Sequence, residues 1–296
     1  MTEPAKGIAA MIAACCVWGL SGIFYKALSD VPATELLAHR MIWSLLFFLA
    51  VLAVQNGLGQ LRPLWQSRDG FRASLAAGAL ISVNWFGFIY AVQNGYALQA
   101  SLGYYIFPLI AVLLGVVALK DALSRRQSFA VALAAIAVLG LSIGLGVAPW
   151  LALLLATTFG FYGLVKKLSP LTPLASVVAE VIIVIPFAIG YLAWLEFGSG
   201  LASFGQDLSQ SFLLACSGPL TGLPLLLFTY ASRRVNLSTM GLIQYINPSL
   251  QFLVAVFLFN ETFTWVHGFA FALIWTALAI YSSEKITRHR ARTGSF

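Results

Sequence analysis

Apolar stretches of about 20 residues follow one another along almost the whole 296-residue chain, with short polar connections between them. Charged residues make up 9% of the sequence, whereas soluble domains carry about 25%. The chain therefore cannot hide its apolar side chains in one aqueous core, and a membrane protein is predicted. Backbone groups inside a bilayer must bond to one another, and the stretches lack the alternation of barrel strands, so helices are expected. We place ten of them at about residues 7–27, 33–55, 73–94, 98–119, 127–147, 149–167, 173–195, 211–232, 237–259 and 263–283.

The two halves of the sequence resemble each other. Ser101–Leu109 (SLGYYIFPL) and Met240–Ser249 (MGLIQYINPS) both place a tyrosine three residues before a proline, and the two prolines are 140 positions apart. Self-similarity at a fixed offset is typical of a duplicated unit. Each unit holds five predicted helices, and because five is odd, the second unit must enter the membrane upside down relative to the first. We therefore predict an all-α polytopic membrane protein whose ten transmembrane helices form two inverted five-helix repeats, over residues 1–147 and 148–285.

Basic residues gather in alternate connections between the predicted helices. All of the 17 lysines and arginines except Lys26 and Arg40 lie on one side. Cytoplasmic loops are rich in Lys and Arg, so both chain ends are expected in the cytoplasm, with residues 286–296 as a basic cytoplasmic tail. This placement explains the net charge of +7 without a nucleic-acid partner. The three cysteines lie in apolar stretches and predict neither a disulfide nor a metal site.

Several distinct short motifs are spread over nearly the whole chain. They are Trp18-Gly19 with Lys26, Glu35-Leu36-Leu37-Ala38-His39-Arg40 followed by Trp43-Ser44, Asn84-Trp85 leading to Ile89-Tyr90-Ala91-Val92, Ser101-Leu102-Gly103-Tyr104-Tyr105, Phe159-Gly160-Phe161-Tyr162-Gly163, and Gln244-Tyr245-Ile246-Asn247-Pro248. Together they resemble the RarD group of EamA-type transporters, in the drug/metabolite transporter superfamily. The resemblance implies ten helices, a central cavity between the halves, and movement of small molecules across the bacterial inner membrane. The sequence departs from the group at Ile106-Phe107-Pro108, where the group has Ile-Asn-Pro.

Ionisable residues inside a membrane helix are costly and are therefore functional candidates. The second predicted helix carries Glu35 and His39, which share one face, and Arg40 beside them. We expect Arg40 to line the cavity and attract an anionic group such as a substrate carboxylate, and we consider Glu35 and His39 as coupling residues. Two structural alternatives for Arg40 stay open, an ion pair with Glu35 and a side chain that extends to the membrane interface.

The seventh predicted helix carries Glu180 within the apolar run SVVAEVIIVIP, at the position that corresponds to His39 in the repeat. A lone carboxylate in such a run can exchange protons, so Glu180 is the main coupling candidate if protons drive transport. The structural alternative is a hydrogen bond that joins two helices.

Pro108 and Pro248 interrupt helical hydrogen bonding, and each should free the carbonyl one turn back, at Tyr104 and Gln244. We interpret the two prolines as hinges or as kinks that shape the cavity. Polar side chains and aromatic rings with polar tips surround them and suit an amphipathic or aromatic solute. The expected substrate-binding residues are Trp18, Arg40, Asn84, Trp85, Tyr90, Ser101, Tyr104, Tyr105, Tyr162, Gln244, Tyr245 and Asn247.

The sequence has neither a phosphate-binding glycine-rich loop ending in lysine nor an HExxH motif. We therefore expect no catalytic residues, cofactor or metal. The predicted function is a secondary transporter that exports small organic metabolites or drug-like molecules by alternating access, surrounded by membrane lipids, with proton coupling left open. An uncoupled facilitator, a membrane-embedded lipid-handling enzyme and a membrane protein without transport activity are the alternatives. The oligomeric state is not indicated.

Overall fold

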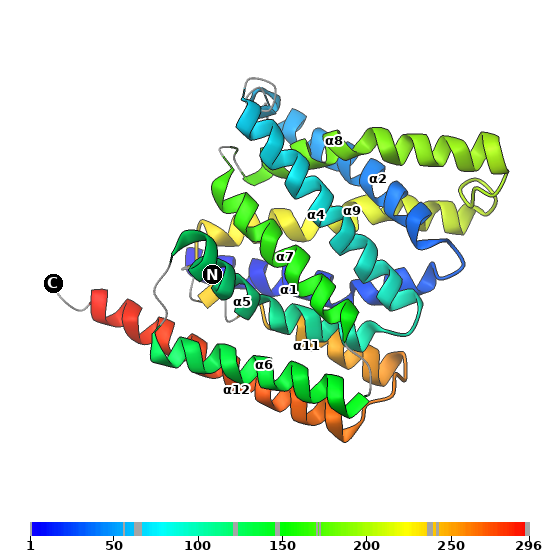
Figure 1. Ribbon diagram of the computed structural model, residues 1–296. Helices are drawn as coiled ribbons and strands as arrows, with labels where there is room; N and C mark the ends of the chain where they lie inside the picture. Colours follow the sequence, from blue (N-terminus) through cyan, green and yellow to red (C-terminus); the bar gives the residue numbers. More distant parts are fainter. Residues whose placement is uncertain are drawn as a thin grey trace.

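The chain folds into a bundle of helices (Figure 1). The computed structural model describes residues 2–55, 57–61, 67–120, 124–145, 149–169, 171, 173–235, 239–240 and 243–293. Over these ranges the only β pairing is an isolated bridge between Phe204 and Asp207, which confirms the all-α class. The elements are α1 (Glu3–Ala27), α2 (Ala33–Val54), the 3-10 turn η1 (Leu58–Leu61), α4 (Arg68–Gln93), α5 (Ala97–Leu119), α6 (Arg125–Leu145), α7 (Trp150–Leu168), α8 (Pro173–Ala193), the π-helical turn η2 (Trp194–Ser199), α9 (Leu208–Ser232), α11 (Ile246–Leu253), the π-helical turn η3 (Val254–Leu258) and α12 (Trp265–Thr293).

Eight helices, α1 to α9 in these labels, are long and apolar enough to cross a membrane. They coincide with the first eight predicted spans and make the chain a multi-pass helical membrane protein. Two shorter apolar helices follow, at Ile246–Leu258 and Trp265–Ile280. Part of the ninth predicted span, the predicted repeat boundary at residues 147 and 148, and residues 294–296 of the predicted tail lie outside the described residues.

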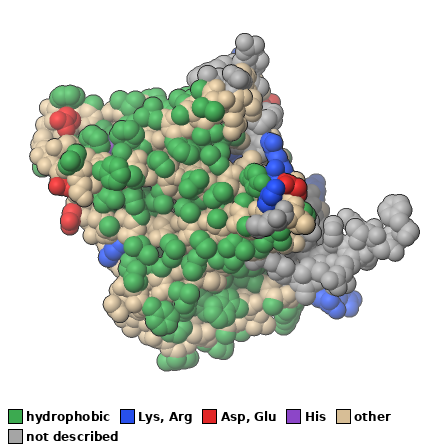
Figure 2. All heavy atoms as spheres, turned by 180° about the vertical axis from the view of Figure 1, so that it is seen from behind, with side chains coloured by type: hydrophobic (Ala, Val, Ile, Leu, Met, Phe, Trp, Pro, Cys, Tyr) green, Lys and Arg blue, Asp and Glu red, His purple; other side chains and the backbone are tan. Residues whose placement is uncertain are grey.

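The surface of the bundle is apolar between two charged ends. Ile143, Phe187 and Trp265 are 81%, 75% and 81% exposed, and Figure 2 shows apolar side chains across the middle of one face. Lipid chains would cover such a band. At one end, named the basic end here, α4 and α6 begin and α9 ends, and exposed side chains there include Arg68, Arg72, Arg125, Arg126 and Arg233. The opposite, acidic end carries the exposed side chains Asp30, Glu196 and Asp207.

Most close helix contacts join the first half of the chain to the second. α1 packs against α9 and α11, and α7 packs against α4 and α5. α2 packs against both α8 and α9, while α4 packs against both α7 and α8. α6 and α12 run side by side along one edge of the bundle (Figure 1). The two halves therefore share one interior instead of forming separate domains.

Glycines allow some of these helices to approach closely. A Cβ atom added to Gly103 of α5 would lie 2.7 Å from the carbonyl oxygen of Ala152 on α7. A Cβ atom on Gly218 of α9 would overlap the backbone of Trp43 on α2. Small residues serve membrane helices in this way because lipid offers little hydrophobic drive for association, and close packing replaces it.

Helical structure breaks just before Pro248, since Ile243 is helical and residues 244 and 245 form a turn. The carbonyl that this proline was expected to free is nevertheless bonded. α11 begins at Ile246, so Pro248 lies in the first helical turn, where a missing N–H group breaks no intrahelical bond. The carbonyl oxygen of Gln244, expected to be free, accepts the N–H of Asn247 at 3.2 Å. Pro108 lies inside α5, as expected.

Candidate functional site

Arg40 of α2 is buried where helices from both halves meet, with 7% of its surface exposed. Its Nε donates a hydrogen bond to Oγ1 of Thr221 on α9 at 2.8 Å. The guanidinium lies 4.2 Å from the ring centroid of Trp85 and 5.4 Å from that of Tyr25. Among the described residues no carboxylate pairs with Arg40, so the predicted alternative of an ion pair with Glu35 is not formed. Arg40 is thus a buried cation held by aromatic rings and a hydroxyl group.

A second polar group surrounds Asn84 of α4, which is 1% exposed. Its amide nitrogen donates to Oγ1 of Thr158 and to a backbone carbonyl of α7, both at 2.9 Å. The hydroxyl of Tyr104 on α5 donates to Oδ1 of Asn84 at 3.1 Å. The ring of Phe88 makes edge contacts with Tyr104 and with Tyr25, each at 5.9 Å between centroids. The Asn84 group is therefore joined to the aromatic surroundings of Arg40.

Three predicted substrate-binding residues lie where α5 crosses α11. The hydroxyl of Ser101 donates to the carbonyl oxygen of Pro248 at 2.9 Å. The hydroxyl groups of Tyr105 and Ser249 bond to each other, and the rings of Tyr105 and Tyr245 stack with their centroids 6.5 Å apart. These side chains connect the two halves of the chain directly.

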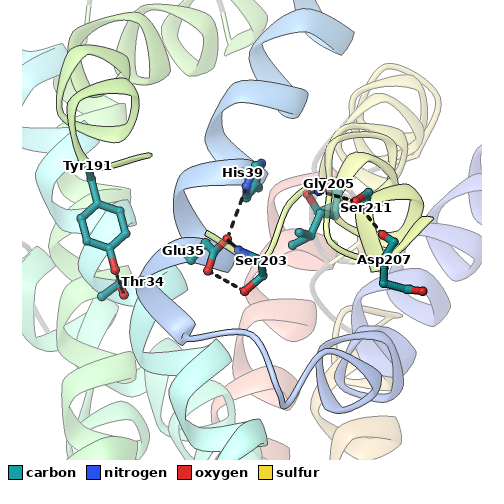
Figure 3. A network of polar contacts seen from close by, with 10 residues as sticks. Thr34, Glu35, His39, Tyr191, Ser203, Gly205, Asp207 and Ser211 are labelled. Carbon is teal, nitrogen blue, oxygen red and sulfur yellow. Dashed lines mark hydrogen bonds and ion pairs between the residues drawn. The ribbon is translucent and has the colours of Figure 1, made fainter. Parts of the chain in front are cut away.

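Glu35 and His39 lie at the acidic end of α2 and hold a loop of the second half (Figure 3). The carboxylate of Glu35, with 0% of the residue exposed, accepts the backbone N–H of Ser203 at 2.7 Å and its hydroxyl at 2.8 Å. Nε2 of His39 lies 3.9 Å from the same carboxylate. The imidazole stacks on the ring of Phe204 at 4.9 Å. Of the three predicted coupling residues, Glu35 and His39 thus contact the loop that leads into α9.

Glu180 of α8 is 1% exposed, but it is not the lone carboxylate that its apolar sequence context suggests. Lys166 of α7 approaches it at 2.7 Å, and Tyr162 of the same helix donates to it at 3.0 Å. Ser176, one turn earlier on α8, donates at 2.9 Å. Lys166 belongs in sequence to a basic connection, and its side chain bends back to neutralise the buried charge. The Glu180 group therefore bridges α7 and α8.

The remaining predicted residues lie apart from Arg40 and Glu180. Trp18 packs against Phe228 with ring centroids 6.1 Å apart. Tyr90 stacks on a neighbouring ring of α4 at 6.0 Å. The side chain of Asn247 accepts a hydrogen bond from the side chain of Gln251 at 3.0 Å. The backbone carbonyl of Gln244 accepts the N–H of Asn247. In this conformation these residues pack against, or bond to, other residues of the protein.

Sequence reasoning did not identify several partners of the predicted residues. Tyr25 and Lys166 occupy corresponding positions in the repeat, 141 apart, and each contacts the ionisable residue of the following helix. Because tyrosine and lysine differ in type, comparing the two copies does not single out this position. Thr221 carries no signal either, because a hydroxyl in an apolar helix is common and its partner lies 181 residues away.

One sequence match to a catalytic motif has a structural role. Gly140-Leu141-Ser142-Ile143-Gly144 fits the pattern Gly-x-Ser-x-Gly of a hydrolase nucleophile. That chemistry requires a sharp turn between a strand and a helix, whereas this segment lies within α6. The hydroxyl of Ser142 donates to the carbonyl of Val138 at 2.9 Å, as helical serines commonly do.

Comparison with known proteins agrees with this membrane architecture. Residues 5–143 match the EamA-like transporter family. An uncharacterized transporter of Vibrio cholerae is 41% identical over 97% of this chain and 95% of its own length. The uncharacterized transporter YojE of Bacillus subtilis is 38% identical over 98% and 97%. The protein RarD of Escherichia coli is 37% identical over 96% of each chain.

A solved crystal structure of a protein shares the fold, with a TM-score of 0.60 and 18% sequence identity over 93% of this chain and 96% of that one. The relatives are named as transporters, in agreement with the expectation of a transporter and not an enzyme. Their similarity extends over nearly the full length. The chain therefore belongs to the EamA-like transporter family, in its RarD group, and is a multi-pass membrane transporter of the drug/metabolite superfamily.

Proposed function

We propose that the protein is a secondary transporter that moves small organic solutes across the bacterial inner membrane by alternating access. The observation that carries this proposal is Arg40, a buried cation at the junction of the two halves with no carboxylate partner among the described residues. A charge that is expensive to bury and lacks a counter-ion favours an anionic ligand. The rings of Trp85 and Tyr25 beside it favour a solute with an apolar or aromatic part.

We propose further that ten helices form two inverted repeats. Pairing α1 with α7, α2 with α8, α4 with α9, α5 with α11 and α6 with α12 turns the principal contacts into one another. The contacts of α1 with α9 and α11 become those of α7 with α4 and α5. Three pairs, α2 with α8, α5 with α11 and α6 with α12, contact their own counterparts. This pattern supports a two-fold relationship with the site between the repeats.

We place the basic end, with both chain termini, in the cytoplasm. The exposed arginines of this end and the exposed acids of the other support the assignment, since positive residues are retained on the cytoplasmic side. Export as the direction of transport rests on the family resemblance. Solute uptake into everted vesicles, compared with right-side-out vesicles, tests it.

The test of the Arg40 site is ligand-dependent thermal stability of the purified protein. Aromatic and aliphatic carboxylates are compared with their neutral amides of the same shape. A ligand that binds only the folded state at 100 times its Kd adds about 2.7 kcal/mol, so binding raises the melting temperature. Carboxylates are expected to stabilise the protein more than amides, and Arg40→Ala should remove this difference. Arg72→Ala, at an exposed position of α4, is the matched control.

Two results would contradict the anion site. One is equal stabilisation by acids and amides. The other is a carboxylate preference that survives in both Arg40→Ala and Arg40→Lys. Stabilisation by lipids alone would argue against any small solute in this position.

Solute accumulation driven by a pH gradient distinguishes a proton-coupled transporter from an uncoupled facilitator. If protons drive transport, Glu180 is our proposed exchange group, because it is buried and its neighbours can share a proton. Proteoliposomes with an imposed pH gradient should then accumulate solute, and Glu180→Gln should abolish the accumulation. A wild-type protein that only equilibrates the solute in either gradient would establish the facilitator.

A further inference from the structure

The loop between η2 and α9 contains a short segment bounded by two glycines with unusual backbone angles. Gly200 has φ +65° and Gly205 has φ +90°, values that favour glycine over other residues. A Cβ atom at either position would meet nothing within 4 Å. Neither glycine is therefore required by close packing, and each forms a turn at one end of residues 201–204. The N–H of Gly205 donates to the hydroxyl of Ser211 at 2.8 Å, and that of Leu201 to the carbonyl of Leu195 at 3.2 Å, so few bonds hold the two ends.

One buried carboxylate fixes this segment. Both oxygens of Glu35 are used by Ser203, one by its N–H and one by its hydroxyl. Figure 3 shows the loop passing over α2 at this point, with Tyr191 and Thr34 bonded separately at 2.7 Å to one side. Both of these hydrogen bonds from the segment to the first half of the chain thus depend on one acidic side chain.

The apolar contacts of the segment are incomplete. Phe204 covers the imidazole of His39, and its ring lies 6.2 Å from the ring of Trp43, yet Phe204 remains 39% exposed. The indole N–H of Trp43 is buried and has no hydrogen-bond partner in the described structure. Buried donors are normally paired, so this group has an unused bonding capacity that a second arrangement of the loop could satisfy.

Two helices connect the segment to the Arg40 site. Glu35, His39 and Trp43, which the segment contacts, form one face of α2, and Arg40 directly follows His39 on an adjoining face of the same helix. The loop then continues into α9, the helix whose Thr221 bonds to Arg40. A displacement of residues 201–204 would therefore uncover the acidic end of α2 next to the buried guanidinium.

The second repeat uses the corresponding positions differently. Glu35 and His39 correspond to Ser176 and Glu180, at an offset of 141. The pair on α8 is bonded to Lys166 and Tyr162 of the preceding helix, not to a connecting loop. Within the described part of the chain, attachment of a loop to this polar pair is thus seen at the acidic end alone.

We propose that residues 201–204 are a lid over the acidic-end access to Arg40, which opens by rotation at Gly200 and Gly205 and is latched by Glu35 through Ser203. The proposal rests on the proposed transport function, because a lid presupposes a solute that enters or leaves at this end. In the structure the lid is closed.

The test measures access to a cysteine beside Arg40. Thr221→Cys, at a position 6% exposed, serves as the reporter in a protein whose Cys15, Cys16 and Cys216 are replaced by alanine. A small membrane-impermeant methanethiosulfonate is added outside intact cells, and the labelling rate is measured. Glu35→Ala is expected to raise this rate at least tenfold, and Phe204→Ala should raise it as well. Glu196→Ala, which removes an exposed carboxylate at the same end, should leave it unchanged.

Equal labelling rates in all four proteins would overturn the lid. If Glu35→Ala fails to fold, Phe204→Ala still decides, because its side chain is partly exposed and not part of the core. Hydrogen exchange provides a reading that does not need the reporter. The amide of Ser203 should exchange at least tenfold faster in Glu35→Ala than in the parent, whereas amides inside α9 should not change; unchanged exchange at Ser203 overturns the latch.

A second reporter separates the lid from the proposed orientation. Gln206→Cys is exposed on the same loop, outside the lid segment. Labelling of Gln206→Cys from outside, with unchanged Thr221→Cys rates, overturns the lid and leaves the transport proposal intact. Labelling of Gln206→Cys only after permeabilisation overturns the orientation and, with it, the placement of the lid.

Discussion

The rings of Tyr105 and Tyr245 lie almost parallel, with 14° between their planes and 6.5 Å between their centroids. The two residues hold corresponding positions in the sequence repeat, 140 apart. In the proposed two-fold arrangement, equivalent residues can touch only close to the axis that relates the copies. In that arrangement the crossing of α5 and α11 would therefore lie on this axis, where both halves must fit at once.

We expect the two tyrosines to be energetically coupled. Stacked aromatic pairs contribute about 0.5–1.5 kcal/mol beyond their buried area. A double-mutant cycle with Tyr105→Leu and Tyr245→Leu, measured by denaturant unfolding in detergent, should give a coupling of about 1 kcal/mol. Tyr105→Leu combined with Tyr191→Leu, on α8 at the acidic end, should be additive to within about 0.5 kcal/mol. Additivity in both cycles would show that the stacking contributes nothing.

Removal of Lys166 should destabilise the fold strongly. Lys166→Met leaves the carboxylate of Glu180 buried without its counter-ion, and breaking a buried ion pair in this way costs about 3–5 kcal/mol. Adding Glu180→Gln to Lys166→Met should recover most of this loss, because the uncompensated charge is then gone. Lys167→Met, at the exposed neighbouring position, should change stability by less than about 0.5 kcal/mol. A Lys166→Met protein as stable as the Lys167→Met control would show that Glu180 does not need this partner.

Gly218→Ala should weaken the contact between α2 and α9. The added methyl group would overlap the backbone of Trp43, which cannot rotate away as a side chain can. Overpacking of this kind costs about 1–3 kcal/mol. Gly140→Ala is the control, because a Cβ atom there meets nothing within 4 Å and alanine favours the helix by about 1 kcal/mol. Melting temperatures of the two variants should therefore shift in opposite directions.

Glu261 lies between the last two apolar helices and joins the halves by accepting the N–H groups of Ala97 and Leu98, at 2.6 and 2.7 Å. Burial raises the pKa of Glu261, although these two N–H groups and Lys26 act in the opposite direction. The folded protein therefore binds the proton of Glu261 more tightly than the unfolded chain does. By linkage, this carboxyl should stabilise the fold most at low pH and progressively less as the pH rises above the ordinary glutamate pKa, near 4.3, through its raised value.

The measurement is the difference in melting temperature between the parent and Glu261→Gln from pH 4 to pH 8. The parent should lose stability relative to the variant as the pH rises through this window, and the difference should then level off. A relative gain with rising pH would mean that the hydrogen bonds of Ala97 and Leu98 outweigh burial. Glu196→Gln, which removes an exposed carboxyl group, is measured alongside as the matched control.

The sequence was sufficient to predict most of the architecture. Eight helices lie where the apolar stretches predicted them, because membrane thickness alone sets the length of a spanning helix. Arg40, Asn84 and Glu180 were singled out as polar groups in apolar runs, and all three are buried in the bundle. These predictions needed only local sequence, since a polar side chain within an apolar run can be recognised before its partners are known.

The partners themselves could not be predicted. Glu35 bonds to Ser203, which lies 168 residues further along the chain, and no spacing rule links a helix start to a distant loop. Lys166 was grouped with basic residues that orient helices, but its flexible stem reaches the buried Glu180. Pro248 was placed inside a helix because the apolar run continues on both sides, whereas α11 begins at Ile246. In each case tertiary contacts decided the outcome.

The hydrogen bond between Arg40 and Thr221 also constrains how the protein is made. The two residues are 181 positions apart, so α2 is synthesised and delivered to the membrane long before α9 exists. During that interval the guanidinium lacks its hydrogen bond to Thr221, and water or lipid headgroups are expected to take that place. The early helices are thus expected to enter the bilayer in a shallow or incomplete position and to settle only as the ribosome releases α9. Biogenesis of this transporter would then end with a late rearrangement, set by the position of one arginine.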